Sequence, residues 1–164
     1  MTISKQIKSK ISKEGLLSIS IDEVEVPEPK DGEVLIKVQA TPINPSDLGL
    51  LMGPADVSSL KVVEKGSLIE MQVPKELIQS VSARFDQDLP VGNEGAGIVE
   101  SAGKGAKHLI GKTVGVAGGA MYSEYRCLPA MSCLEMNQGT TSEQAASCFV
   151  NPLTALGMVE TMRM

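Results

Sequence analysis

Two glycine-rich stretches come close to motifs that bind nucleotide phosphates. Residues 111–113 read Gly-Lys-Thr, the end of a phosphate-binding loop, but that motif needs a glycine five positions before its Gly-Lys pair, where Ala106 stands. Gly95 and Gly97 begin a dinucleotide-binding pattern whose third glycine would fall at Glu100. Because both motifs depend on their spacing, we predict no nucleotide-phosphate site in this chain.

Side chains that often bind metals or act as nucleophiles are few and widely spaced. Cys127, Cys133 and Cys148 show no Cys-x-x-Cys spacing, and the single histidine, His108, has no neighbour at ligand spacing. Three cysteines cannot all pair with one another, so reduced thiols are the simpler interpretation. We therefore predict no metal site and inert cysteines. A nucleophilic cysteine whose histidine partner is distant in the sequence stays open.

Composition narrows the classes of function. With 42% hydrophobic and 21% charged residues, the 164-residue chain is typical of one ordinary globular domain. Two Tyr, two Phe, no Trp and a net charge of -5 argue against a nucleic-acid partner, which needs aromatic platforms and basic patches. No apolar run approaches the roughly 18 residues of a membrane span, and the N-terminus lacks the apolar core of a signal peptide. We expect a cytoplasmic protein with no membrane partner.

The first part of the chain is predicted to form strands that prolines interrupt. Apolar and polar residues alternate over Leu16–Val26 and Glu33–Ala40, as is typical of half-buried strands. The four lysines within residues 5–13 could face an anionic partner, but we interpret them as the charged face of an edge strand. Ser46 is expected to cap a short helix that ends near Gly53.

The middle of the chain combines one helical segment with many short strands. Residues 73–85 repeat apolar side chains at helical spacing, on a face formed by Leu77, Ile78, Val81 and Phe85. After Pro90, closely spaced glycines separate short β-rich pieces. Because glycine permits tight corners and bulges, this pattern indicates a small barrel or sandwich.

The end of the chain is predicted to be helical. Thr140 and Glu143 have the spacing of a capping box ahead of a helical stretch. Pro152 is expected to interrupt that stretch, and a second amphipathic stretch runs to Met164.

Four motifs occur in one order along the chain: INPSDLGLLMG, PVGNEGAGIVESAG, GKTVGVAGGAMYSEY and SCFVNPLTALG. In that order they resemble the N-terminal, GroES-like catalytic domain of the medium-chain dehydrogenases/reductases. The NPSD and GNEG motifs resemble the branch of zinc-free quinone oxidoreductases and related 2-enoyl thioester reductases. The resemblance extends from about Leu16 to Met164.

The resemblance implies a mainly β fold with short helices, a GroES-like partly open β-barrel that occupies residues 1–164. It also implies a C-terminal helical segment, with Met158, Val159 and Met162 as an apolar stripe, that leads into a Rossmann domain. We expect that cofactor-binding Rossmann domain to lie outside this chain.

The implied chemistry is hydride transfer from NADPH to a small-molecule substrate, a quinone or an activated alkene such as an enone or enal. The full-length protein is expected to be an NADPH-dependent oxidoreductase and a homodimer. The isolated chain is expected to bind NADPH weakly or not at all and to have no turnover. Zinc-dependent members carry a Cys and a His where Asn44 and Asn93 stand here, and Asn is a poor zinc ligand. Zinc independence is therefore expected.

The same resemblance implies the site residues. Asn44, Asp47 and Tyr122 would line the active-site cleft, with no proton donor assigned among them. Asn44 and Thr154 would contact the cofactor, with Thr154 against the nicotinamide. Structural alternatives stay open, because Asn44 and Asp47 could simply form a turn after Pro42, and Thr154 could be a residue at the start of a helix.

Two features depart from the family pattern. Enoyl thioester reductases of this type place a Tyr proton donor shortly after NPSD, where this sequence reads LGLLMGPAD. Enoyl reduction by that mechanism is therefore not expected. The Gly53–Pro90 segment is longer than the family usually shows, and it could be a lid over the cleft or a surface decoration.

Two other classes of function stay open. A GroES-like fold without a cofactor domain could be a non-catalytic binding or assembly module, with Gly53–Pro90 as its candidate loop. It could also be an accessory domain that serves a partner's Rossmann domain in trans.

Overall fold

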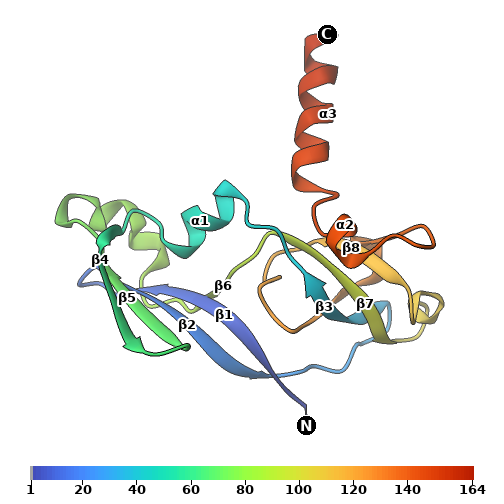
Figure 1. Cartoon of the computed structure of the whole chain (residues 1–164), viewed down its shortest axis with the longest axis horizontal. Helices are drawn as coiled ribbons and strands as arrows, with labels where there is room; N and C mark the ends of the chain where they lie inside the picture. The colour runs from blue at the N-terminus through green and yellow to red at the C-terminus, as the bar shows by residue number, and fades with distance from the viewer. Residues whose placement is uncertain (1) are drawn as a thin grey trace.

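Two curved antiparallel sheets lie side by side, and a long helix rises from one end of the molecule (Figure 1). This computed structural model describes residues 2–164. The first sheet has the strand order β4-β5-β2-β1-β6, and the second has the order β10-β8-β7-β3-β9. The arrangement confirms a mainly β fold with short helices, in which the second sheet curls into a partly open barrel.

The strands of the first sheet are β1 (Ile3–Ile11), β2 (Leu16–Glu25), β4 (Asp56–Glu64), β5 (Leu68–Gln72) and β6 (Leu89–Pro90). Those of the second sheet are β3 (Glu33–Ala40), β7 (Glu94–Ala102), β8 (Thr113–Ala117), β9 (Tyr125–Pro129) and β10 (Cys133–Glu135). The α-helices are α1 (Pro45–Leu51), α2 (Ser142–Ala145) and α3 (Val150–Met162). Three 3-10 helices are η1 (Lys75–Arg84), η2 (Lys107–Leu109) and η3 (Ala130–Ser132).

The second sheet is built around β3, which the sequence predicted correctly. Val34 and Ile36 are fully buried on this strand, which pairs with β7 on one side and β9 on the other. Gly97 permits the close approach of β7, because a Cβ there would collide with the backbone carbonyl of Lys37. The register then brings the residues that follow β3 beside the first residues of β7.

In the first sheet, β2 is also confirmed, but β1 is not the edge strand that its lysines suggested. It pairs with β2 along its whole length and with β6 at residues 8–9. Ile7 and Lys5 also form backbone hydrogen bonds with residues 122–124, which approach from the second sheet. β1 is therefore covered on both sides and joins the two sheets.

Three of the four lysines in this segment face carboxylates of the same chain. The ion pairs join Lys8 to Asp22 at 3.1 Å, Lys10 to Asp88 at 3.3 Å and Lys13 to Asp86 at 3.8 Å. These lysines therefore do not form an unpaired basic patch.

The helix after β3 begins two residues earlier than the predicted Ser46 cap. Asn44 is the N-cap of α1, and Pro45 occupies the first turn, where its fixed φ is favourable. The carboxylate of Asp47 accepts a hydrogen bond from the backbone N–H of Asn44 at 2.8 Å. That bond satisfies a donor at the helix start, so Ser46 is not needed as the cap.

The C-terminal helices differ from the prediction in two details. α2 is capped by Thr141 together with Gln144, one residue beyond the predicted pair of Thr140 and Glu143. Pro152 lies in the first turn of α3 and does not interrupt it. In that turn the missing N–H of a proline would have no partner within the helix anyway.

Residues 54–89 belong to the first sheet. β4 and β5 pair at its edge, and η1 has 3-10 geometry. Ile78, Val81 and Phe85 pack against the buried side chains of β1, β2 and β5, whereas Leu77 is exposed. These contacts make the segment part of the packing of the first sheet. The segment lies at the end of the first sheet away from α3 (Figure 1).

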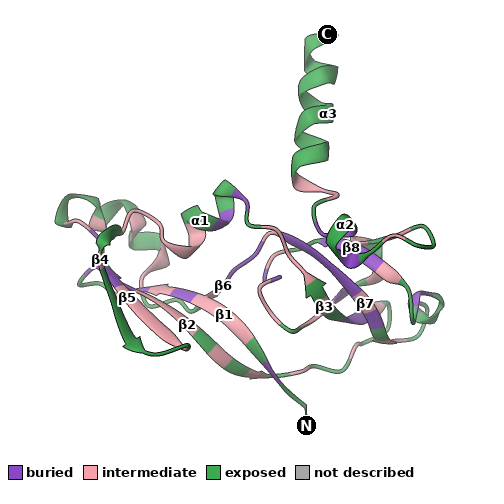
Figure 2. Ribbon diagram, viewed as in Figure 1, coloured by how far each residue is buried: buried purple, intermediate pink, exposed green. Residues whose placement is uncertain are grey.

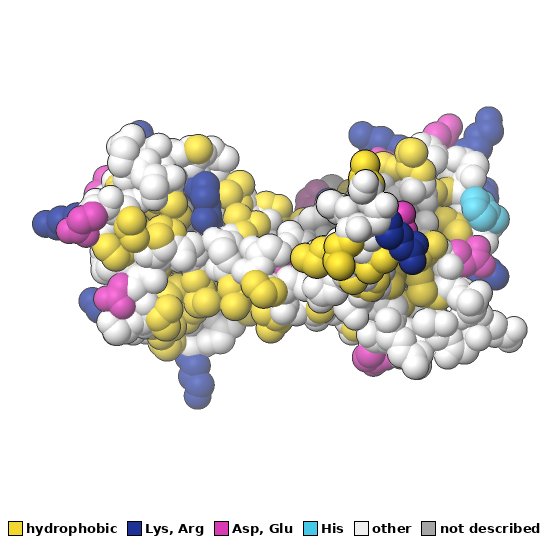
Figure 3. All heavy atoms as spheres, turned by 90° about the horizontal axis from the view of Figure 1, so that it is seen from above, with side chains coloured by type: hydrophobic (Ala, Val, Ile, Leu, Met, Phe, Trp, Pro, Cys, Tyr) yellow, Lys and Arg dark blue, Asp and Glu magenta, His cyan; other side chains and the backbone are white. Residues whose placement is uncertain are grey.

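α3 stands clear of both sheets (Figure 2). Residues 151–164 are all exposed, including six large apolar side chains: Leu153, Leu156, Met158, Val159, Met162 and Met164. Seen along the helix, hydrophobic side chains lie on several of its sides, and basic and acidic groups lie on another (Figure 3). A helix with exposed apolar side chains on several sides is typical of one that another part of a protein covers.

Within residues 2–164, none of the helices combines the length and the apolar character needed to cross a membrane.

Arg84 fastens η1 to the C-terminal end of α1. Its guanidinium donates hydrogen bonds to the carbonyl of Leu50 at 2.6 Å and to the hydroxyl of Ser9 at 3.3 Å. Carbonyls at a helix C-terminus lack partners within the helix, so Arg84 supplies a donor that α1 needs.

The substitution Arg84→Met keeps the aliphatic stem and removes these donors. We expect it to lower the free energy of unfolding by about 1–3 kcal/mol, measured by urea denaturation. Lys75→Met, at the exposed start of the same 3-10 helix, should change it by less than about 0.5 kcal/mol. Equal effects of the two substitutions would show that the Arg84 contacts contribute nothing specific.

Candidate functional site

A buried carboxylate, that of Asp47, joins the start of α1 to the start of β7. Asp47 is 1% exposed and accepts hydrogen bonds from the backbone N–H groups of Asn44 at 2.8 Å and Asn93 at 2.9 Å. The side chain of Asn93 donates to the hydroxyl of Ser46 at 2.8 Å. Because a buried carboxylate is costly without donors, these bonds hold the turn after β3 against β7.

Glu94 provides a second buried carboxylate, fully enclosed, at the first position of β7. Its Oε1 accepts a hydrogen bond from Nδ2 of Asn44 at 3.1 Å. Its Oε2 accepts the backbone N–H groups of Phe149 at 3.1 Å and Val150 at 2.9 Å. Negative charge is favourable at the N-terminus of a helix. Glu94 therefore connects Asn44 with the first turn of α3.

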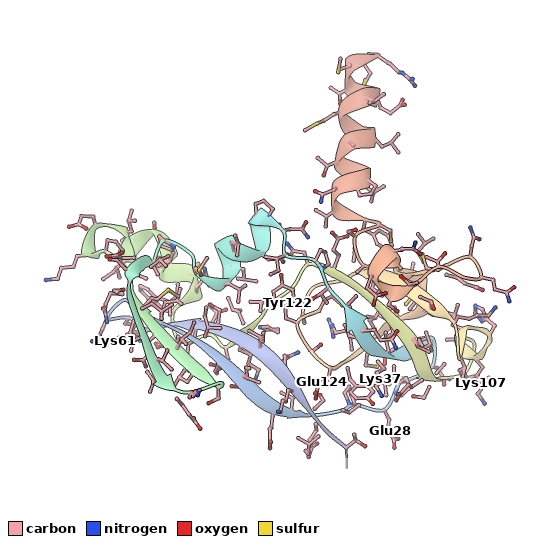
Figure 4. All side chains as sticks on the ribbon, in the orientation of Figure 1. Glu28, Lys37, Lys61, Lys107, Tyr122 and Glu124 are labelled. Carbon is pink, nitrogen blue, oxygen red and sulfur yellow. The ribbon has the colours of Figure 1, made fainter. Side chains whose placement is uncertain are left out.

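Tyr122 lies at the waist between the two sheets (Figure 4). Its hydroxyl donates a hydrogen bond to the carbonyl of Pro42 at 3.0 Å. Burial and the nearby Asp47 carboxylate raise the pKa of Tyr122 to about 12. The phenol is therefore protonated at neutral pH and is a weak acid.

Tyr122 also lines a cleft of about 420 Å³ between β1, the end of β3 and the loop before β9. Small-molecule sites have volumes of roughly 300–1,000 Å³ and mostly apolar walls with a few polar groups. This cleft has both kinds of side chain, among them Ile7, Val38, Ile43, Met121, Gln39 and Glu124. Tyr122 is the predicted cleft residue that lies on its wall, whereas Asn44 and Asp47 are buried in the turn that follows Ile43 and do not line the cleft.

Thr154 lies on the exposed part of α3, one turn after the helix start. Its hydroxyl donates to the carbonyl of Val150 at 2.7 Å. Val150 is one of the two residues whose N–H groups Glu94 holds. Asn44 and Thr154 are thus connected through Glu94 and one helical turn.

All three thiols have raised pKa values. Burial and the Glu33 carboxylate raise the pKa of Cys127, and burial and the Glu94 carboxylate raise that of Cys148. Burial raises the pKa of Cys133 to about 11. Protonated thiols are weak nucleophiles, so the environments agree with the interpretation of inert cysteines.

The Gly-Lys-Thr run at residues 111–113 is not followed by a helix. Thr113 is the first residue of β8, and Lys112 forms an ion pair with Glu135 at 3.1 Å. A phosphate cradle needs a helix after the loop. The geometry therefore agrees with the prediction that this run is no phosphate site.

Asn44 and Asn93, which stand where zinc-dependent relatives have ligands, both use their side-chain amides in hydrogen bonds. Asn44 donates to Glu94, and Asn93 donates to Ser46. Within the described part of the chain, no group of three or more His, Cys, Asp or Glu side chains is placed to hold a metal ion.

Glu94 is the site residue that the sequence analysis did not single out. The signal in the sequence was its place, because this acidic residue stands directly before the apolar and glycine run GAGIV, which is mostly buried in β7. Its partners lie 50, 55 and 56 residues away in the sequence. No local spacing could therefore reveal what this side chain binds.

Comparisons with known proteins agree with this geometry. The alcohol dehydrogenase GroES-like domain matches residues 30–158. A zinc-type alcohol dehydrogenase-like protein from Schizosaccharomyces pombe is 31% identical over 151 residues. Two solved structures described as NADPH:quinone reductases are similar in fold. The one from Bacillus thuringiensis is 26% identical with a TM-score of 0.69, and the one from Mesorhizobium loti is 23% identical with a TM-score of 0.66.

The chain spans less than half the length of each of these proteins. The match to the S. pombe protein covers 87% of this chain and 37% of that protein. The corresponding shares are 100% and 43% for the B. thuringiensis structure and 99% and 46% for the M. loti structure.

Because the pKa of Tyr122 is raised, the free energy of unfolding changes with pH in the alkaline range. An unfolded tyrosine ionises at about pH 10, whereas folded Tyr122 keeps its proton to about pH 12. Between these values the folded state binds more protons than the unfolded state, so stability falls as pH rises. We expect Tyr122→Phe to remove this part of the pH dependence in denaturation experiments.

The chain has two tyrosines, so the pKa can be measured directly. In a Tyr125→Phe background, the ultraviolet absorbance of tyrosinate should titrate with a midpoint close to pH 12. A midpoint near pH 10, the ordinary value, would contradict the environment described for Tyr122.

Proposed function

The chain belongs to the alcohol dehydrogenase GroES-like domain family of the medium-chain dehydrogenases/reductases, and on this premise we propose that it is the catalytic-domain portion of a zinc-independent, NADPH-dependent oxidoreductase. The proposed reaction is the reduction of a quinone or an activated alkene, an enone or enal, by hydride transfer. The observation that carries the proposal is the cleft of about 420 Å³ beside Tyr122 and the Asn44 turn. We propose that the full-length protein is a homodimer.

The residues of this chain fit the nicotinamide end of NADPH. Thr154 is exposed on α3, and Glu94 fixes the amide of Asn44 at the base of the same helix. The cleft beside the Asn44 turn has apolar walls with a few polar side chains, such as Gln39 and Thr41, which suits a ring that carries a carboxamide. The pyrophosphate needs a glycine-rich turn between a strand and a helix, and residues 111–113 do not supply one. We therefore assign the phosphates to a domain outside this chain.

NADPH supplies the hydride when it is bound. The residues of this chain bind and orient the substrate and keep water away. The apolar walls of the cleft, which include Val38, Ile43 and Met121, favour a ring-shaped substrate over water. Tyr122 is not assigned as the proton donor, because its hydroxyl already donates to Pro42 and its pKa is raised.

The proposed zinc independence is supported by the side-chain chemistry at positions 44 and 93. A neutral amide oxygen binds zinc more weakly than a thiolate or an imidazole. Both amides are also engaged with neighbouring side chains, Glu94 and Ser46. The zinc-type description is that of the S. pombe relative.

The assembly-module alternative has no specific observation in its favour. Its candidate loop, Gly53–Pro90, contains β4, β5 and η1 and contributes side chains to the core of the first sheet. A mobile docking loop would have few such contacts.

The proposal is tested on the full-length protein that contains this chain, purified from its source cells. We expect it to oxidise NADPH in the presence of 1,4-benzoquinone or a simple enone, followed by the loss of NADPH absorbance. Asn44→Ala should lower kcat/KM by about 10- to 100-fold, because it removes the amide that ties the turn beside the cleft to Glu94 and so changes the position of that turn. Asn137→Ala, on an exposed loop, is the matched control and should leave the rate unchanged.

Two results would contradict the proposal. The first is the absence of NADPH-dependent reduction across a panel of quinones, enones and enals. The second is an Asn44→Ala protein with the same kcat/KM as the Asn137→Ala protein.

A further inference from the structure

One buried side chain binds the first turn of α3. Residues 151–164 are exposed, and the helix stands away from the sheets (Figure 2). In the described part of the chain, two hydrogen bonds join the first turn of α3 to the sheets, from the N–H groups of Phe149 and Val150. Both end on Oε2 of Glu94.

The other carboxylate oxygen of Glu94 binds the side chain of Asn44, in the turn after β3. Oε1 accepts Nδ2 of Asn44 at 3.1 Å. Asn44 is 3% exposed, so this amide is shielded from water and depends on protein partners. The two oxygens of one rigid, planar group thus face two elements that are far apart in the sequence.

We propose that Glu94 is a positioning residue that orients the Asn44 side-chain amide and the first turn of α3 relative to each other. It thereby sets where Thr154, one turn further along, lies with respect to Asn44. The inference rests on the proposed function, because that function gives Asn44 and Thr154 their role beside the nicotinamide. Its test uses no ligand, so it can succeed or fail separately from the proposed reaction.

Charge makes a carboxylate better suited to this position than a neutral group. An ionised carboxylate only accepts hydrogen bonds, and all three of its partners are N–H donors. It also lies at the N-terminus of a 13-residue helix, where negative charge is favoured. If Glu94 only stabilised the core, replacing it would lower the free energy of unfolding. The direction of α3 in the folded state would then stay the same.

Three variants separate these possibilities. Glu94→Gln keeps the shape, but it removes the negative charge at the N-terminus of α3 and leaves one accepting oxygen where the native side chain has two. Asn44→Asp keeps the shape on the other side and places two carboxylates against each other. The double variant Glu94→Gln with Asn44→Asp restores a donor–acceptor pair with reversed polarity and returns the number of carboxylates to that of the native chain.

The measurement is NMR of the chain of residues 1–164, with residual dipolar couplings for the orientation of α3 and hydrogen exchange for its first amides. In Glu94→Gln we expect reduced couplings throughout α3 and exchange of the Phe149 and Val150 amides that is faster by about tenfold or more. The side-chain amide signal of Asn44 should also shift. The double variant should restore the native couplings and slow exchange.

Glu100→Gln is the matched control, the same chemical change on the exposed outer part of the same strand. It should change neither the couplings of α3 nor the exchange of its amides. Native couplings and native exchange in Glu94→Gln would overturn the proposal, as would a double variant that behaves no better than the single one.

If Glu94→Gln does not fold, Asn44→Asp decides the question. Asp is as favourable as Asn at a helix N-cap, so this variant keeps the start of α1. We expect faster exchange of the Phe149 and Val150 amides at neutral pH, where the two carboxylates repel. Unchanged exchange would show that the Asn44 side is not coupled to α3, and it would overturn the proposal.

Discussion

A buried carboxylate must find donors, and at Glu94 this requirement determines how three parts of the chain meet. The side chain is fully enclosed, and N–H groups from the turn after β3 and from the start of α3 surround its oxygens. An unsatisfied charge in such a place would cost far more than a typical hydrogen bond contributes. The site therefore holds together because each element supplies a donor that this carboxylate needs. Asp47 repeats the arrangement with the backbone N–H groups of Asn44 and Asn93.

The rest of the fold brings these donors together. The pairing of β3 with β7, which Gly97 allows to be close, places the Asn44 turn beside Glu94. β1 links the two sheets through its hydrogen bonds with residues 122–124. The same bonds fix the backbone of Tyr122 at the wall of the cleft. At the far end, Arg84 ties the 54–89 segment to the C-terminus of α1. α1 is thus held at both ends, by carboxylates at its start and by a guanidinium at its end.

Local sequence patterns predicted the elements whose formation depends on neighbouring residues in the chain. The strands β2 and β3 followed from alternation, and the short helix after β3 followed from its flanking prolines and glycine. The motif order also indicated the fold and the family. Two of the predictions that were wrong depended on partners distant in the sequence, whereas the shifted cap of α2 and the role of Pro152 were local errors. Asn44 replaced Ser46 as the cap because Asp47 and β7 fix that turn, and β1 gained a second neighbour from residues 122–124. Glu94 could not be singled out, because its donors lie 50 to 56 residues away.

The central claim is that one surface, formed by the Asn44 turn and the start of α3, faces the nicotinamide ring. A crystal structure of the full-length protein with NADPH bound would test it most directly. The account predicts that the ring lies between the Asn44 turn and Thr154, with its reactive face toward the cleft beside Ile43 and Tyr122. A nicotinamide ring bound away from both Asn44 and Thr154 would contradict it.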